Sequence, residues 1–345
     1  MNILILSHSF LHNGKEATEI TINSFARELE EKGHTVHIIP EKSILKTIQK
    51  ARKLKKEKNI SFDVIHGFSA APLLATKVIL TKLLVSRKAR TVQTIKSYSK
   101  HFFGSLYFSP LLNLIDHVTV STNQFKKKLV QCGCLNKKIQ LIRSHIDTKK
   151  FVPLNQRELK QKYGYGDKKI IFYYGSFYRT KGVPELLKAS QRIVQGNPNT
   201  ILLICPRHSV DQDIQELTKS LNITDRVKFV TENVNIVEYL NLADVLVLPY
   251  TSMIGTEGNP SCLIEAAACK IPIVTSNFPE LREIFTPEKE VLMADPGNIQ
   301  ELEQKIIEIL SNPLLAQKRA EQAFRKTKQF DIQKITPEFI NIYSS

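Results

Sequence analysis

The chain has 345 residues, of which 42% are hydrophobic and 24% are charged. This length exceeds what one hydrophobic core usually supports, so we expect two domains. The composition is that of a globular α/β protein and argues against disorder. The apolar run 3–6 is too short for the core of a signal peptide, so we expect no signal peptide. The uncharged run 102–115 is too short for a membrane-spanning helix, so we expect no such helix.

The net charge of +16 is confined to the N-terminal part of the sequence. Residues 1–150 hold 26 Lys and Arg against 10 Asp and Glu, whereas residues 151–345 hold 23 of each. A basic field on one domain indicates an anionic partner, which could be a membrane surface, a nucleic acid or a charged acceptor. We do not expect nucleic acid, because no recognisable binding module or repeated stacking motif is present.

The five cysteines form no zinc-like CxxC knuckles, and their odd number fits reduced thiols better than a disulfide framework. We assign them no role and expect a cytoplasmic protein. No His and Asp constellation suits a divalent ion, so no metal site and no cofactor are expected.

Strands and helices alternate along the N-terminal half. We expect strands at 3–6, 35–39, 63–66, 91–95, 117–121 and 139–143, and helices at 17–32, 72–85 and 123–131. This order predicts a doubly wound parallel sheet with right-handed crossovers, in a domain covering residues 1–152.

A second α/β series follows residues 151–167, which we interpret as an interdomain linker because apolar periodicity is lost there. Strands are expected at 169–174, 200–205, 227–230, 245–248 and 273–275, helices at 183–195, 210–221, 236–242 and 261–269, and one long helix after Gly297. The second domain is 153–330, and we consider that the terminal segment 331–345 returns to the first. Two such domains place a ligand cleft at the C-terminal ends of their strands.

Two glutamates flank a glycine-bearing loop and a helix start in the stretch 257–265, which reads EGNPSCLIE. Pro260 stands near the helix start, where backbone amides can receive a diphosphate or sugar hydroxyls. Glu265, one turn inside the helix, could accept hydrogen bonds from ribose hydroxyls, and Glu257 could bind a sugar. The alternative is an ordinary capping loop with a surface glutamate on each side.

Lys181 lies between Gly175 and Gly182, in the loop that joins strand 169–174 to the next helix. A lysine there can neutralise phosphate charge beside helix-end amides. The alternative is a solvated lysine in a turn.

The chain resembles, over essentially its whole length, the retaining bi-domain glycosyltransferases often called family 4, whose GT-B fold pairs two Rossmann-like domains. The resemblance rests on the two glutamates and on the motifs 33–36, 62–66, 121, 146–153, 175–182, 243–249 and 272–274. It implies that Lys181 binds the diphosphate, that Glu265 binds the ribose, and that Glu257 with the backbone of 258–260 contacts the donor sugar. The implied donor-binding residues are Gly175, Ser176, Arg179, Lys181, Glu257, Gly258, Asn259, Pro260, Ser261 and Glu265.

The sequence departs from the family pattern at three positions. Ser176 replaces a usual phosphate-binding arginine, for which Arg179 could compensate, and the first loop keeps a single glycine, Gly14. Lys96 stands where relatives carry a histidine, so Lys96 and Gly14 are our acceptor-side residues. His66 becomes the candidate for contact with the acceptor or the sugar. We predict that His66, Lys181 and Glu257 are the catalytic residues. The alternative for His66 is a structural hydrogen-bonding role.

The predicted function is sugar transfer from a nucleotide-sugar donor to a saccharide or lipid-linked acceptor, without a metal, in cell-envelope glycan or glycolipid synthesis. The resemblance implies retention of anomeric configuration. The alternative is a noncatalytic relative that binds a nucleotide sugar or an anionic surface, which the departures at Ser176 and Lys96 motivate.

Residues 41–58 form a basic amphipathic segment. Its apolar face could lie on the anionic inner face of the membrane, or it could pack inward as an outer Rossmann helix, and the pattern favours neither. The aromatic segment 101–108, with basic residues nearby, suggests the same membrane surface or a buried helix.

Overall fold

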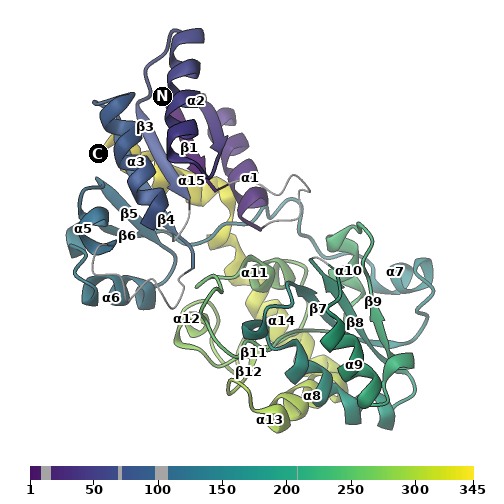
Figure 1. Ribbon diagram of the computed structural model, residues 1–345. Coiled ribbons are helices and arrows are strands. Elements are labelled where there is room, and N and C mark those ends of the chain that lie inside the picture. Colours follow the sequence, from purple (N-terminus) through teal and green to yellow (C-terminus); the bar gives the residue numbers. More distant parts are fainter. Residues whose placement is uncertain (9–16, 69–71, 98–107, 208) are drawn as a thin grey trace. The chain divides into compact units, whose positions relative to one another are not determined.

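A computed structural model describes residues 1–8, 17–68, 72–97, 108–207 and 209–345 of the protein. Its contacts divide the chain into two compact units. The first unit comprises 1–145, 257–259 and 332–345, and the second comprises 146–256 and 260–331. Each contains one parallel six-stranded sheet with flanking helices, which confirms the predicted fold class (Figure 1).

The first unit orders its strands β2-β1-β3-β4-β5-β6. These strands are β1 (Asn2–Ser7), β2 (Thr35–Pro40), β3 (Val64–Phe68), β4 (Arg90–Ile95), β5 (His117–Val120) and β6 (Ile139–Leu141). The helices are α1 (Ala17–Glu31), α2 (Ile44–Glu57), α3 (Pro72–Leu84), α5 (Phe108–Asn113), α6 (Asn123–Gln131) and α15 (Ile332–Ser344), with a 3₁₀ turn at Asn136–Lys138.

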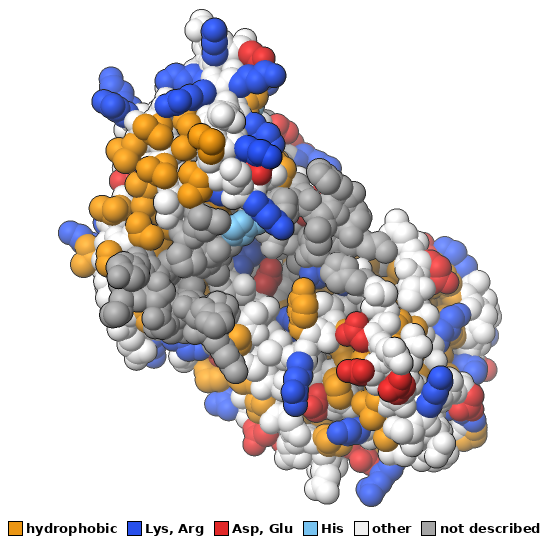
Figure 2. Space-filling view, viewed as in Figure 1, with side chains coloured by type: hydrophobic (Ala, Val, Ile, Leu, Met, Phe, Trp, Pro, Cys, Tyr) orange, Lys and Arg blue, Asp and Glu red, His pale blue; other side chains and the backbone are white. Residues whose placement is uncertain are grey.

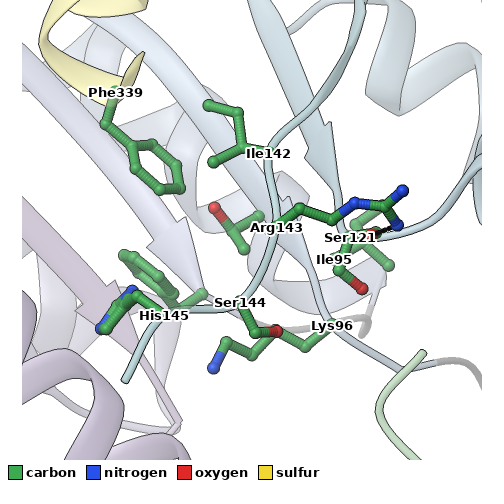
Figure 3. Close-up of a pocket in the computed structure, with 10 residues that line it drawn as sticks. Ile95, Lys96, Ser121, Ile142, Arg143, Ser144, His145 and Phe339 are labelled. Carbon is green, nitrogen blue, oxygen red and sulfur yellow. Dashed lines mark hydrogen bonds between the residues drawn. The ribbon is translucent and has the colours of Figure 1, made fainter. Parts of the chain in front are cut away.

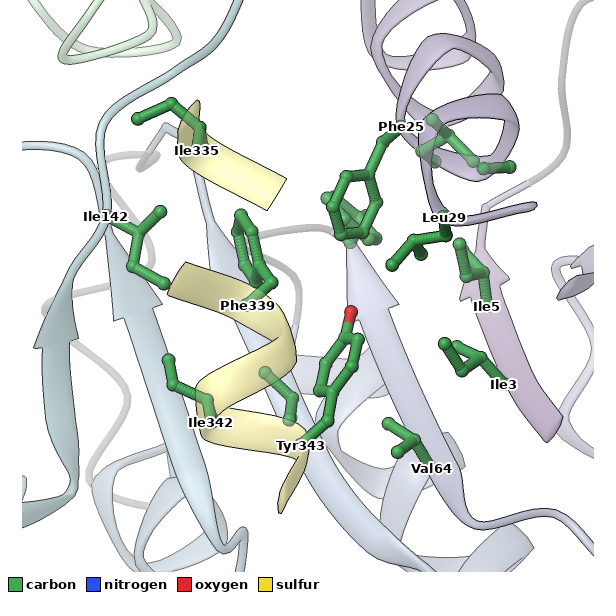
Figure 4. Close-up of a cluster of buried hydrophobic side chains, with 14 residues drawn as sticks. Ile3, Ile5, Phe25, Leu29, Val64, Ile142, Ile335, Phe339, Ile342 and Tyr343 are labelled. Atoms are coloured by element: carbon green, nitrogen blue, oxygen red, sulfur yellow. The ribbon is translucent and has the colours of Figure 1, made fainter. Parts of the chain in front are cut away.

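The C-terminal helix α15 supplies part of the core of the first unit. Its Phe339 and Tyr343 face Phe25 and Leu29 of α1 and the strands beside them (Figure 4). These side chains are almost fully removed from water. Because hydrophobic burial is the dominant favourable term in folding, the end of the chain stabilises the domain that its beginning builds.

The second unit orders its strands β12-β11-β10-β7-β8-β9. They are β7 (Lys169–Gly175), β8 (Thr200–Pro206), β9 (Val227–Phe229), β10 (Val245–Leu248), β11 (Ile273–Ser276) and β12 (Leu292–Ala294). The helices are α7 (Gln156–Lys162), α8 (Val183–Gly196), α9 (Gln212–Ser220), α10 (Ile236–Leu242), α11 (Ser261–Ala268), α12 (Pro279–Arg282), α13 (Ile299–Ser311) and α14 (Pro313–Thr327). The 3₁₀ turns are Arg179–Lys181, Thr224–Arg226 and Lys328–Phe330.

The strand order of the second sheet creates a topological switch point. The chain runs outward from β7 through β8 to β9, and then returns to the other side of β7 with β10 and continues to β12. In open parallel sheets, ligands bind outside the carboxyl ends of the strands where the order reverses. This position lies between β7 and β10.

Three predictions about the chain's organisation need correction. The expected linker contains helix α7, which packs against α10 in the second unit. The long helix expected after Gly297 is interrupted, because Pro313 cannot donate the hydrogen bond that would continue α13 and instead begins α14; the terminal helix expected at 331–345 is present as α15. Strand β12 was missed, because its three residues are too few for a periodic signal.

The basic helix α2 packs inward, as the outer-helix alternative predicted. Its Ile48 and Ala51 are buried, and α2 contacts α3. Exposed apolar side chains lie on both helices: Leu45 of α2 is 66% exposed, and Leu83 and Leu84 of α3 are 52% and 48% exposed. Figure 2 shows apolar side chains gathered over α3, with Lys and Arg side chains beside them. The buried part of the apolar face of α2 is thus used within the first unit, and Leu45 at its start remains exposed.

Within the described ranges, no helix has both the length and the hydropathy needed to cross a membrane.

Candidate active site

The turn from β7 to α8 holds the amine of Lys181. Lys181 closes a 3₁₀ turn, and its Nζ donates a hydrogen bond of 3.0 Å to Thr256 Oγ1. The same Nζ lies 5.1 Å from the ring centroid of Tyr250, in the loop after β10. A cation is thereby fixed at the switch point of the second sheet.

Gly182 allows the turn to approach the chain after β10. Its φ of 72° lies in the left-handed region, and a Cβ atom at this position would come within 1.7 Å of the Pro249 carbonyl oxygen. Only glycine fits such an approach without displacing backbone. The contact joins the end of β10 to the start of α8, and so determines where Lys181 stands.

Glu265 lies on α11, the helix that follows β10. No side chain caps the first turn of α11, whose N-cap residue is Pro260. The hydroxyl of Tyr174 donates a hydrogen bond to Glu265 Oε2. Burial, and then the negative charge of Glu265, raise the pKa of Tyr174 well above its usual range, so this tyrosine stays protonated and donates. Tyr174 therefore orients the carboxylate.

The sequence analysis did not identify Tyr174, Thr256 or Tyr250 as members of this arrangement. Tyr174 immediately precedes Gly175 at the end of β7, which was the one available signal.

Of the other predicted residues, Ser176 is buried and accepts a 2.7 Å hydrogen bond from Tyr173 through its carbonyl oxygen. Arg179 has an exposed side chain in the same turn as Lys181.

Residues 257–259 belong to the first unit, where they contact the end of β4. Lys96 Nζ lies 3.8 Å from Glu257 Oε1, and the Gly258 amide donates a 3.1 Å hydrogen bond to the Lys96 carbonyl oxygen. A Cβ at Gly258 would approach Phe125 to 3.1 Å. Lys96 and Glu257, which were predicted on separate grounds, are thus brought together.

Asn259 is fully buried, and neither its side-chain oxygen nor its nitrogen has a hydrogen-bond partner within the part of the chain that is described. A buried amide without partners is costly, so such groups are usually satisfied by a ligand or by water.

His66 requires a correction. It does not stand at a strand end facing a substrate; it lies within β3 and is fully buried. Its Nδ1 lies 2.6 Å from the Tyr343 hydroxyl, and its Nε2 lies 2.6 Å from Thr94 Oγ1. Both ring nitrogens are therefore occupied, which fits the structural alternative and leaves no atom for an acceptor or sugar.

Burial also lowers the pKa of His66 and of His145 to about 3. In the unfolded chain a histidine titrates near pH 6.5, so below that pH the unfolded state binds protons that the folded state does not. Stability is thus expected to fall as the pH decreases from 6.5 towards 3.

When the pH is lowered from 7 to 5.5, we expect the free energy of unfolding to decrease less in His66→Gln than in the wild type. The two decreases should differ by about 1 kcal/mol. Urea unfolding at the two pH values measures this difference. An equal loss in both proteins would contradict the account of His66.

Gly14 and segment 101–107 lie outside the described residues. In the remainder, no group of three or more His, Cys, Asp or Glu side chains is arranged to hold a metal ion. All five cysteines are free thiols.

Comparison with known proteins identifies the family and the fold. Residues 155–326 match the family described as "Glycosyl transferases group 1". The N-acetyl-alpha-D-glucosaminyl L-malate synthase of Bacillus anthracis is 24% identical over 82% of this chain and 74% of its own. The capsular polysaccharide biosynthesis glycosyltransferase CapM of Staphylococcus aureus is 22% identical over 94% of this chain and 89% of its own.

Among solved structures, Anabaena HepE in complex with UDP and glucose superposes over 100% of both chains, with a TM-score of 0.82 and 16% sequence identity. This similarity extends the family match to the fold of the first unit. The protein is therefore a GT-B glycosyltransferase of the group 1 type.

Proposed function

We propose that the protein transfers a sugar from a nucleoside-diphosphate sugar to a saccharide or lipid-linked acceptor in cell-envelope glycan synthesis. One observation carries the donor assignment: Lys181 follows β7 and Glu265 follows β10, the two strands that flank the switch point of the second sheet. Cell-envelope synthesis is supported by the capsular relative, and the UDP complex of the structural neighbour makes UDP the first nucleotide to test.

The proposed roles follow from the charges. Lys181 stabilises the diphosphate as negative charge develops on it, in a turn that Thr256 and Gly182 hold in place. Glu265, whose carboxylate Tyr174 orients, accepts hydrogen bonds from the ribose hydroxyls. Glu257, Gly258 and Asn259 contact the transferred sugar, and a sugar hydroxyl would satisfy the buried Asn259 amide.

We further propose that transfer retains the anomeric configuration and needs no metal ion. Lys181 and the helix-end amides supply the positive charge that a metal would otherwise provide to the leaving group. The anomer of the product and its yield in the presence of a chelator test these two points directly.

The experiment that tests the donor assignment is thermal unfolding with UDP, GDP, ADP and their sugar conjugates. A ligand that binds only the folded state raises the melting temperature, by several degrees at about a hundred times its Kd. We expect one nucleotide class to do so. No shift with any nucleotide would contradict the donor site and favour the noncatalytic alternative.

We also propose that the first unit binds an anionic membrane surface through α3. The exposed Leu83 and Leu84 adjoin a groove lined by Arg52, Lys55 and Lys56, and Lys55 Nζ donates a 2.7 Å hydrogen bond to the Val85 carbonyl oxygen. Exposed leucines beside a cationic groove suit the acyl boundary and the anionic head groups of a bilayer.

We predict that Leu83→Glu/Leu84→Glu reduces binding to phosphatidylglycerol vesicles at least about tenfold, and that salt weakens wild-type binding. Co-sedimentation at two salt concentrations measures both effects. Leu314→Glu is the matched control, because Leu314 is 89% exposed on α14 of the second unit. The membrane proposal fails if the wild type does not bind at low salt, or if both variants bind alike.

A further inference from the structure

A small cavity opens in the first unit beyond the carboxyl ends of β4, β5 and β6. Lys96, Ser121, Arg143, Ser144 and His145 line it, together with apolar side chains (Figure 3). These five residues follow the last residues of β4, β5 and β6, and Thr94, near the end of β4, also lines the cavity. Carboxyl ends of parallel strands are where this fold class binds ligands.

Two hydroxyl groups in the cavity have unmet hydrogen-bonding capacity. Ser121 is 4% exposed and Ser144 is 5% exposed, and the Oγ of each has no partner among the described residues. Buried hydroxyls without partners are uncommon in native proteins, because leaving them unpaired lowers the stability of the fold. Two of them lining one cavity indicate an absent group that accepts hydrogen bonds from both.

The charge of the lining is positive. Lys96 Nζ is held 3.0 Å from Thr21 Oγ1 and lies 3.8 Å from Glu257 Oε1. Arg143 donates a 2.8 Å hydrogen bond to the Ser121 carbonyl oxygen, which keeps its guanidinium beside the cavity. Helix α6 begins two residues after Ser121, so the positive end of its dipole lies near this hydroxyl.

His145 adds hydrogen-bonding capacity and no charge. Its Nε2 lies 3.3 Å from Ser24 Oγ, and burial together with Lys96 lowers its pKa to about 3, so the ring is neutral at physiological pH. A lining that holds the cationic Lys96 and Arg143 together with the hydroxyls of Ser121 and Ser144 favours an anionic oxygen ligand over a neutral one.

We infer that this cavity binds a phosphate or carboxylate group of the acceptor, so that the enzyme selects acceptors that carry negative charge. The assignment to the acceptor rests on the proposed function, in which the nucleotide diphosphate and ribose are bound by Lys181 and Glu265 of the second unit. Anion binding itself does not depend on that function. It would explain part of the basic excess of residues 1–150.

The test uses the full chain, with inorganic phosphate and succinate as probes in calorimetric titrations at constant ionic strength set with chloride. We expect saturable binding of at least one probe. Binding should weaken at least about tenfold in Ser121→Ala/Ser144→Ala and in Lys96→Met, and should persist in Lys181→Ala. Ser190→Ala is the control, because Ser190 Oγ is likewise buried and without a partner, but lies on α8 of the second unit.

The inference would be overturned if neither phosphate nor succinate bound detectably in the chloride buffer. It would also be overturned if the wild type and the first-unit variants bound the probes with equal affinity. Loss of phosphate binding in Lys181→Ala alone would place the anion in the donor site and would overturn it as well. UDP titrated into the same samples separates the two proposals: if UDP fails to bind while phosphate binding depends on Ser121 and Ser144, only the donor assignment is lost.

Discussion

We expect Gly182→Ala to destabilise the second unit by at least about 3 kcal/mol and to abolish nucleotide binding. The new Cβ would lie 1.7 Å from the Pro249 carbonyl oxygen. Because the backbone fixes the position of a Cβ and the carbonyl oxygen is itself a backbone atom, the backbone must move to relieve the clash. The φ of 72° adds strain that every residue except glycine experiences. Urea unfolding and UDP titration of the folded fraction measure the two effects.

Gly196→Ala is the matched control, since Gly196 ends the same helix and a Cβ there would meet nothing within 4 Å. We expect it to be neutral or slightly stabilising, because alanine lowers the entropy of the unfolded chain. If Gly182→Ala behaved like Gly196→Ala, the close approach of the turn to the end of β10 would be wrong.

Lys181→Ala is expected to weaken UDP binding at least about tenfold while leaving uridine binding nearly unchanged. The reason is that Lys181 is proposed to contact the diphosphate, which uridine lacks. With the donor that the nucleotide panel identifies, kcat/KM should fall at least about a hundredfold, because the charge on the leaving diphosphate is greatest in the transition state.

Lys188→Ala serves as the control, because Lys188 is an exposed lysine on α8, the helix that Lys181 precedes. Calorimetry with UDP and uridine, followed by donor turnover, separates a phosphate contact from a general loss of structure. Equal weakening of UDP and uridine by Lys181→Ala would indicate that the lysine supports the fold instead of binding phosphate.

Much of the fold follows from local sequence patterns. Apolar runs bounded by turn residues located nearly every strand, and helices α6 and α10 begin and end where the pattern predicted. Alternation of strands and helices was enough to predict parallel sheets. The failures have local causes too: α7 is a short, polar helix with a weak stripe, and Pro313 ends one helix by beginning another.

The role of His66 could not be predicted in this way. Its environment depends on Tyr343, which lies 277 residues further along the chain and reaches β3 only because α15 packs on α1. A pattern read over a short window contains no information about such a partner. The positions of Lys181 and Glu265 in the fold were predictable for the opposite reason. Lys181 lies in the turn between a strand and a helix, and Glu265 lies one turn inside the helix that follows β10, so each position depends on local context.

The most direct test of the central claim is a crystal structure of the protein with UDP. The account predicts that the diphosphate lies within hydrogen-bond distance of Lys181 Nζ and that the ribose hydroxyls contact Glu265, at the carboxyl ends of β7 and β10. A nucleotide bound away from both residues would contradict it.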